Sequence, residues 1–339
     1  MTFSRDLRRL AQRVALPLAL SAALLVACGG GTSQVQRFIP ARLIVLGDES
    51  SMIEDFVDAA GIHDGFKYGI NDRSSSASNK CLALPNFVQS VATYYGFAFA
   101  QCNPNVITPQ AFNLALRLAK VDDPTTGLAQ QLTAVPDLGR RDMVTMMIGS
   151  NDVIELYERT QNGLSRTDAI AEAHRRAIVA ADQVNAILRS GARALVFTIP
   201  NLGLSPYAQT ANTIDPGASA LLSTLSTEFN AYLRTRIDSN AYDGRNYGLV
   251  LADDIVAAMV RAPGSFLTAP SVNNLPACKL DSDLSADAVD KAVLACDTTT
   301  LVDGASSGSH LWASDRHIGP GAQSRIGAQA QSRAGTNPF

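Results

Sequence analysis

The chain has 339 residues, of which 46% are hydrophobic, and a formal net charge of −3 at pH 7. A mildly acidic protein with no basic cluster beyond its first residues binds polyanions poorly, which argues against nucleic acid as a partner. The length and the ordinary apolar fraction favour one large domain.

The first residues have the parts of an export signal. A basic segment precedes an apolar stretch, 14–26, that is too short to span a bilayer, and the segment ends in Ala27-Cys28. This ending resembles the lipobox of bacterial lipoproteins. We therefore expect 1–27 to be a signal peptide, Cys28 to carry lipid, and 28–40 to be a flexible tether. An ordinary secretory signal is the alternative.

These features predict an exported protein, anchored by lipid in the bacterial cell envelope at the outer membrane or the periplasmic face. Its partners would then be the membrane, through the lipid, and a small-molecule substrate, with no nucleic acid. Removal of 1–27 would take away four Arg and one Asp and so lower the formal charge to −6.

Short apolar runs rich in β-branched residues predict buried strands. These runs are 42–46, 97–101, 143–148, 194–199 and 247–252. Segments with helical periodicity lie between and after them, at 84–95, 109–119, 166–188, 218–237 and 321–333. Alternating strands and helices predict an α/β fold, a three-layer α/β/α sandwich around a mainly parallel sheet. We expect a single domain over 41–335.

Four cysteines remain besides Cys28. An even number in an exported chain favours disulfides, and local closure suggests Cys81 with Cys102 and Cys278 with Cys296. None has the spacing of a zinc site. The second pair would staple a long polar excursion, 264–308.

Polar residues follow two of the predicted strands and recur near the end of the chain. They form the segments 47–51 (GDESS), 149–152 (GSND) and 314–317 (SDRH). Loops after parallel strands meet at one edge of a sheet. Hydroxyls, an amide, carboxylates and an imidazole at one edge are the groups that acyl transfer requires.

The order of these segments resembles the SGNH (GDSL) family of esterases and lipases over about residues 41–335. The GSND segment matches the family's GxND block, and 200–206 and 229–233 also fit. The resemblance implies a flavodoxin-like sandwich, no metal and no other cofactor. It also implies a serine nucleophile with a C-terminal histidine base, acting on a small-molecule, lipid or glycan ester.

Carried onto this sequence, the resemblance assigns four roles. Ser50 would be the nucleophile and His317 the base, with Asp315 orienting the imidazole and Asn151 stabilising the oxyanion. The supporting residues would be Gly47, Asp48, Gly149 and Asp152.

The sequence departs from the family pattern in three places. Glu49 stands where the family has its serine, so that Ser50 comes one residue late and Ser51 matches the second, noncatalytic serine. Ser314 stands where the last block has aspartate, and Asp315 is one residue closer to His317. The second block should supply a glycine N–H near 97–105, where no glycine occurs.

Two other functions therefore stay open. The chain could be a catalytically impaired SGNH-fold lipoprotein with a binding role. It could also be an envelope hydrolase that uses carboxylates, with Glu49 paired to Asp152 or Asp315.

Overall fold

The computed structural model describes residues 38–57, 61, 63–73, 80–103, 107–238, 246–280 and 286–335. Phe38–Phe339 form one compact unit. The predicted signal peptide and the lipidation at Cys28 lie outside the described residues. Within the described ranges, no helix combines the length and the apolarity needed to cross a bilayer.

A five-stranded sheet forms the centre of the fold, and all its strand pairs are parallel. Its order is β4 (Ala111–Asn113), β1 (Arg42–Gly47), β5 (Asp142–Met147), β6 (Arg193–Phe197) and β7 (Tyr247–Val250). The inner strands are mainly apolar and are buried along almost their whole length, because helices cover both faces. The predicted α/β class and mainly parallel sheet are confirmed.

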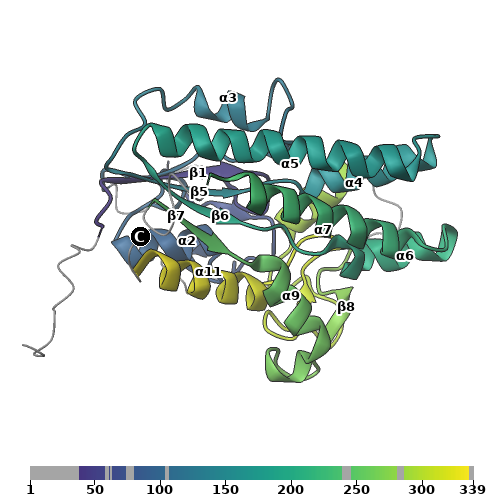
Figure 1. Cartoon of the computed structure of the whole chain (residues 1–339). Coiled ribbons are helices and arrows are strands. Elements are labelled where there is room, and N and C mark those ends of the chain that lie inside the picture. Colours follow the sequence, from purple (N-terminus) through teal and green to yellow (C-terminus); the bar gives the residue numbers. More distant parts are fainter. Residues whose placement is uncertain are drawn as a thin grey trace, which may run out of the picture. The chain divides into compact units, whose positions relative to one another are not determined.

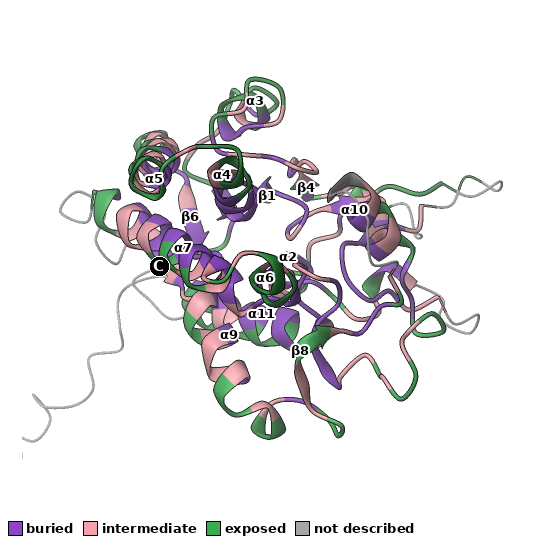
Figure 2. Ribbon diagram, turned by 90° about the vertical axis from the view of Figure 1, so that its right-hand side faces the viewer, coloured by how far each residue is buried: buried purple, intermediate pink, exposed green. Residues whose placement is uncertain are grey.

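Helices lie on both sides of the sheet (Figures 1 and 2). On one side are α4 (Ser150–Gln161) and α5 (Arg166–Arg189), against which α7 (Ala218–Arg236) packs. On the other side, α2 (Phe87–Tyr95) packs against α11 (Pro320–Gly335). The helices predicted at 84–95, 166–188, 218–237 and 321–333 correspond to α2, α5, α7 and α11.

Shorter elements complete the described part. They are β2 (Ile53–Glu54), β3 (Phe66–Lys67), η1 (Lys80–Leu82), η2 (Ala100–Cys102), α3 (Leu128–Leu132), η3 (Leu202–Leu204), α6 (Pro206–Ile214), α9 (Ala252–Arg261), η4 (Pro263–Ser265), β8 (Val272–Pro276), α10 (Ala286–Ala295) and β9 (His310–Trp312).

Two predicted elements are wrong. The run 97–101 forms no strand beyond an isolated bridge at Phe99, and 109–119 is not a helix. Instead, β4 within the latter segment pairs with the edge of β1, aligning Leu43 with Ala111. Pairing with the edge of β1 satisfies the backbone N–H and C=O groups of this segment. The helical periodicity of its side chains carries no information about that pairing.

Both predicted disulfides are confirmed. The Cα atoms of Cys81 and Cys102 are 5.4 Å apart, and those of Cys278 and Cys296 are 5.8 Å apart. The second bridge belongs to a small hydrophobic cluster, separate from the main core, made by Tyr68, Ile70, Ala277, Cys278, Val293, Cys296 and Ala313. This cluster anchors α10, which proves important for the site.

Candidate active site

The turn after β1 brings Asp48 and Glu49 to the carboxyl edge of the sheet. Gly47 has a φ of 138°, and a Cβ atom there would lie 2.0 Å from the carbonyl oxygen of Met147, so that only glycine fits. The Gln131 side chain holds both backbone groups of Gly47, accepting from its N–H and donating to its C=O at 2.8 Å each. The direction of the following side chains is thereby fixed.

Glu49 is buried, and its carboxylate is held by two donors. The Asn151 amide nitrogen lies 3.0 and 2.9 Å from the two carboxylate oxygens, and the Leu118 N–H donates to Oε2 at 2.9 Å. Burial opposes ionisation of Glu49. The imidazole of His317 opposite it and the hydrogen bonds outweigh this effect and hold the pKa of Glu49 below its usual value. Glu49 is therefore a buried, fixed anion.

The Leu118 donor was not expected from the sequence. Leu118 has a φ of 57°, the left-handed conformation that glycine adopts without cost. Its N–H joins the Asn151 amide at one point, the arrangement of an oxyanion hole. The backbone donor at this point is therefore supplied by Leu118 and not by a glycine near 97–105.

His317 is buried and is oriented through Ser314. Its Nδ1 lies 2.7 Å from Ser314 Oγ, which in turn donates to Asp315 Oδ1 at 3.3 Å. Ser314 Oγ also accepts from the backbone N–H groups of Arg316 and His317, so the direction of its bond with Nδ1 depends on the tautomer of the imidazole. In the neutral tautomer that carries its proton on Nδ1, Nε2 presents a free lone pair to the cluster.

Asp315 therefore acts on His317 only through the serine hydroxyl. Its carboxylate is held by the neighbouring Arg316, at 3.0 and 2.8 Å. The direct contact expected between Asp315 and the imidazole is not formed, and Ser314, at the position where the family has aspartate, makes it.

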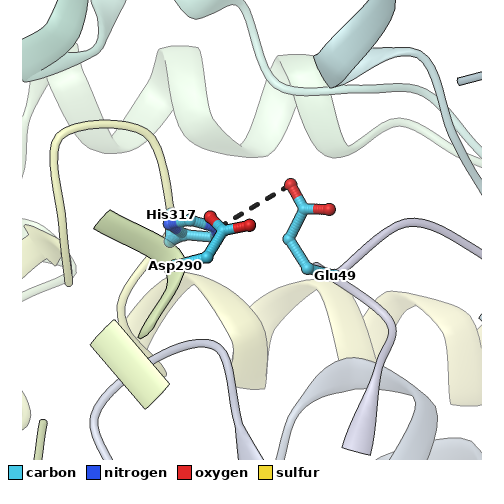
Figure 3. Close-up of side chains that lie close together, drawn as sticks. All are labelled: Glu49, Asp290 and His317. Atoms are coloured by element: carbon cyan, nitrogen blue, oxygen red, sulfur yellow. Dashed lines mark ion pairs between the residues drawn. The ribbon is translucent and has the colours of Figure 1, made fainter. Parts of the chain in front are cut away.

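Asp290, on α10, is a site residue that the sequence did not single out. Its Oδ1 lies 3.4 Å from His317 Nε2, while Glu49 Oε1 lies 3.8 Å from the same nitrogen (Figure 3). Several acidic residues crowd the polar excursion, and none carries a motif. Only the position of Asp290 on the buried face of α10, beside Val289 and one turn before Val293, could have indicated it.

Two carboxylates and an imidazole form a buried cluster. Glu49, Asp290 and His317 are all buried, and one ligand atom of each lies within 4.8 Å of the others. Neither Asp290 oxygen nor His317 Nε2 has a hydrogen-bond partner. Burial raises the pKa of Asp290 to about 6, although His317 opposes the shift. Such a cluster can accept a proton or a cation.

The serines of the first segment do not reach the imidazole. The Ser50 N–H donates to Asp48 Oδ1 at 3.0 Å, and Ser51 is fully buried with an unpartnered hydroxyl. Since His317 Nε2 has no hydrogen-bond partner and Nδ1 is used by Ser314, no hydrogen bond joins Ser50 to His317. Burial and the Glu49 charge raise the pKa of Asp48 well above its usual value.

The second segment supports the site from behind. Gly149 has a φ of 125°, and a Cβ atom there would lie 2.5 Å from the Phe229 ring. Asp152 is buried and accepts from Arg176 at 3.0 Å and from the Val121 N–H at 3.1 Å. Burial outweighs the Arg176 charge and raises the pKa of Asp152 to about 6. Asp152 thus ties the loop that carries Leu118 to α4 and α5.

A cavity of about 680 Å³ is lined in part by residues that are adjacent in sequence to members of the cluster. Its lining includes Val289 and Arg316, the residues directly before Asp290 and His317. Much of the remaining wall is apolar or aromatic, with Tyr157, Pro206, Tyr207, Ile214, Leu275, Pro276 and Leu280. A cavity of this size and lining suits the apolar part of a small ligand.

Comparison with known proteins gives a family and a distant structural likeness. A catalytic mutant of Axe2, an acetylxylan esterase from Geobacillus stearothermophilus, matches at 12% identity and a TM-score of 0.43, covering 90% of this chain and 99% of the other. LAE5, an alpha/beta hydrolase enzyme from the metagenome of Lake Arreo, Spain, matches at 12% identity and a TM-score of 0.39, covering 88% and 96%. No curated protein sequence matches significantly.

The family model for GDSL-like Lipase/Acylhydrolase matches residues 58–305. Both TM-scores lie below 0.5, so the assignment rests on this match. The matched range covers most of the chain but stops short of Glu49 on one side and His317 on the other, so that the match does not depend on either. The chain belongs to the GDSL-like lipase/acylhydrolase family of ester hydrolases.

Proposed function

We propose that the protein hydrolyses carboxylic esters at the cluster of Glu49, Asp290 and His317, with water as the nucleophile. The observation that carries the proposal is the position of Glu49, which faces the imidazole from the place where the family has its serine. An acyl-enzyme at this position would require a carboxylate to attack an ester, which would yield a reactive anhydride. A direct attack by water avoids that intermediate.

The cluster contains the groups that this reaction needs. Water loses a proton to the Nε2 lone pair of His317, and its oxygen forms a bond to the ester carbonyl carbon. The C–O bond to the alcohol then breaks, and the imidazolium returns the proton to the leaving alkoxide. Glu49 and Asp290, 3.8 and 3.4 Å from Nε2, stabilise the imidazolium while it exists.

The cavity beside the cluster supports an ester with an apolar group. Val289 and Arg316 belong to both the cavity wall and the chain segments that carry Asp290 and His317. An acyl chain or aromatic alcohol that fills the cavity would bring its ester bond toward the cluster. Tyr207 and Leu275, which also line the cavity, would contact that group.

The cell envelope is the proposed place of action. The basic and apolar segments before Cys28, and the small residues at the cleavage position, support export and lipid attachment. Two disulfides between the remaining cysteines suit an oxidising compartment. Metabolic labelling with a radioactive fatty acid tests the attachment: wild type should be labelled and Cys28→Ala should not.

Hydrolysis of p-nitrophenyl acetate, butyrate and octanoate by the purified protein tests the reaction. We expect activity in wild type, a loss of at least 100-fold in Glu49→Gln and His317→Ala, and retention in Ser50→Ala and Ser51→Ala. Ser50→Ala is the matched control, because it changes the adjacent side chain in the same turn. Loss in Ser50→Ala with covalent labelling of wild type by a fluorophosphonate would assign the nucleophile to Ser50 instead. An inactive wild type toward all three esters would contradict the proposed function.

A further inference from the structure

We propose that Glu49, Asp290 and His317 bind a divalent transition-metal ion of the Zn²⁺ class. Each contributes one ligand atom: a carboxylate oxygen from the turn after β1, a carboxylate oxygen from α10, and Nε2 of the imidazole before α11. All three side chains are buried, and Figure 3 shows them facing one another.

The distances fit ligands around a common ion better than hydrogen bonds. Nε2 is 3.4 Å from Asp290 Oδ1 and 3.8 Å from Glu49 Oε1, longer than the 2.7–3.2 Å or so of an N–H···O bond. Two tetrahedral ligands, each about 2.1 Å from Zn²⁺, lie about 3.4 Å apart. The ligand oxygens of Glu49 and Asp290 lie within 4.8 Å of each other, and the Glu49 carboxylate would move toward the ion to complete the set.

The hydrogen bonds around the cluster leave the ligand atoms available. With the His317 proton on Nδ1 and directed at Ser314 Oγ, Nε2 presents its lone pair to an ion. A ligating histidine is commonly oriented in this way through its other nitrogen. Both Asp290 oxygens are buried without a hydrogen bond, although an unpaired buried charge is costly.

The charges also favour a cation. Two buried carboxylates face one imidazole, and with that imidazole neutral the cluster carries net negative charge. One nearby cation is Arg117, whose Nη1 is 3.7 Å from Asp290 Oδ2. His317 contacts the other oxygen of that carboxylate, Oδ1. A divalent ion at the centre compensates both carboxylates at once, where a single proton compensates only one.

Binding of the ion is independent of the proposed function, while its catalytic use rests on it. Zn²⁺ with three protein ligands keeps a fourth position for water and lowers the pKa of that water to about 7. The bound hydroxide then forms the bond to the ester carbonyl carbon, and the alkoxide leaves with a proton taken from water. His317 serves as a ligand in this state, and the ion replaces it as the activator of water.

Isothermal titration of the chelator-treated, purified protein with ZnCl₂ tests the site without any ester. We expect one ion per chain in wild type, and at least 100-fold weaker binding in Asp290→Asn and His317→Ala. Ser314→Ala should weaken binding by about 10- to 100-fold, because it removes the partner that orients the ligand.

His310→Ala is the matched control. His310 is also buried with Nδ1 2.8 Å from a serine hydroxyl, that of Ser309, but it belongs to no such cluster among the described residues. It should bind Zn²⁺ as wild type does. Protein-bound Co²⁺ should give visible absorption bands in wild type and in His310→Ala that folded Asp290→Asn lacks.

Two results would overturn the proposal. One is the absence of stoichiometric Zn²⁺ binding in wild type, which would leave the cluster to a shared proton. The other is binding that is unchanged in folded Asp290→Asn and His317→Ala, which would place the ion elsewhere. Ester hydrolysis by protein that binds no metal would uphold the proposed function and reject only the metal site.

Discussion

Ser314 Oγ lies 2.7 Å from His317 Nδ1 and donates a hydrogen bond to Asp315 Oδ1. A hydroxyl thus takes the place that an aspartate occupies in the family's last block. The hydroxyl orients the imidazole without adding a charge beside it. The negative charge is carried instead by the carboxylate of Asp315, the next residue in the chain.

Replacing Ser314 with alanine should lower kcat by about 10- to 100-fold, because the imidazole loses its orienting partner. The backbone N–H groups of Arg316 and His317, which donate to the same Oγ at 3.2 and 3.0 Å, would also lose their acceptor. Ser314→Asp restores an acceptor and should recover most of the activity. Steady-state kinetics on p-nitrophenyl butyrate measures both, and equal kcat values in the two variants would contradict the orienting role.

Removing the Asn151 amide should shift the acid limb of the pH profile. The amide is one of the groups that lower the pKa of Glu49, so Asn151→Ala should raise that pKa, and activity should be lost at a higher pH on acidification. A profile of kcat between pH 4 and 8 measures the shift. Asn113→Ala is the control, since its amide donates to the Ser51 carbonyl at 2.8 Å and not to Glu49; superimposable limbs in all three proteins would contradict the assignment.

The raised pKa of Asp152 makes stability depend on pH with a defined sign. A carboxyl with a pKa of about 6 in the folded state holds its proton more tightly than in the unfolded chain. The contribution of Asp152 to the free energy of unfolding is present in full below the pKa in the unfolded chain, about 3.9. It is lost as the pH rises through about 6, the pKa in the folded state.

Asp152→Asn removes that dependence. The free energy of unfolding of the variant, relative to wild type, should increase by on the order of 2–3 kcal/mol between pH 4 and pH 7.5. Urea denaturation at the two pH values measures the difference. A constant difference between variant and wild type would show that Asp152 is ionised throughout, in its pair with Arg176.

The two disulfides should differ in their effect on activity. Replacing either pair with serines should cost about 2–4 kcal/mol of unfolding free energy, since the loops they close are similar in length. Only Cys278→Ser with Cys296→Ser should also lower kcat strongly under conditions where the protein stays folded, because that bridge anchors the helix of Asp290. Cys81→Ser with Cys102→Ser is the matched control, and equal kcat in the two double variants would contradict the link.

The sheet could be predicted because its central strands carry their signal locally. β1, β5 and β6 are short, mainly apolar runs, and helices on both faces of the sheet bury them. β4 could not be predicted in this way, because its strand character comes from pairing with β1 and not from its own residues.

The site was predictable only where a motif marks it. His317, Glu49 and Asn151 stand at motif positions, and the structure brings them together. Asp290 and the Leu118 N–H have no such marker: the first depends on the folding of α10 around a disulfide, and the second depends on a backbone angle. Side-chain identity alone carries neither piece of information.

The cluster joins the beginning of the described chain to its end. Glu49 follows the first strand, whereas Asp290 and His317 come after the last strand of the five-stranded sheet. A chain interrupted after Val250 would hold every strand of that sheet and still leave Glu49 without either partner. During synthesis the centre therefore becomes chemically complete only after His317 has been added, and shorter fragments that look folded by spectroscopy should have none.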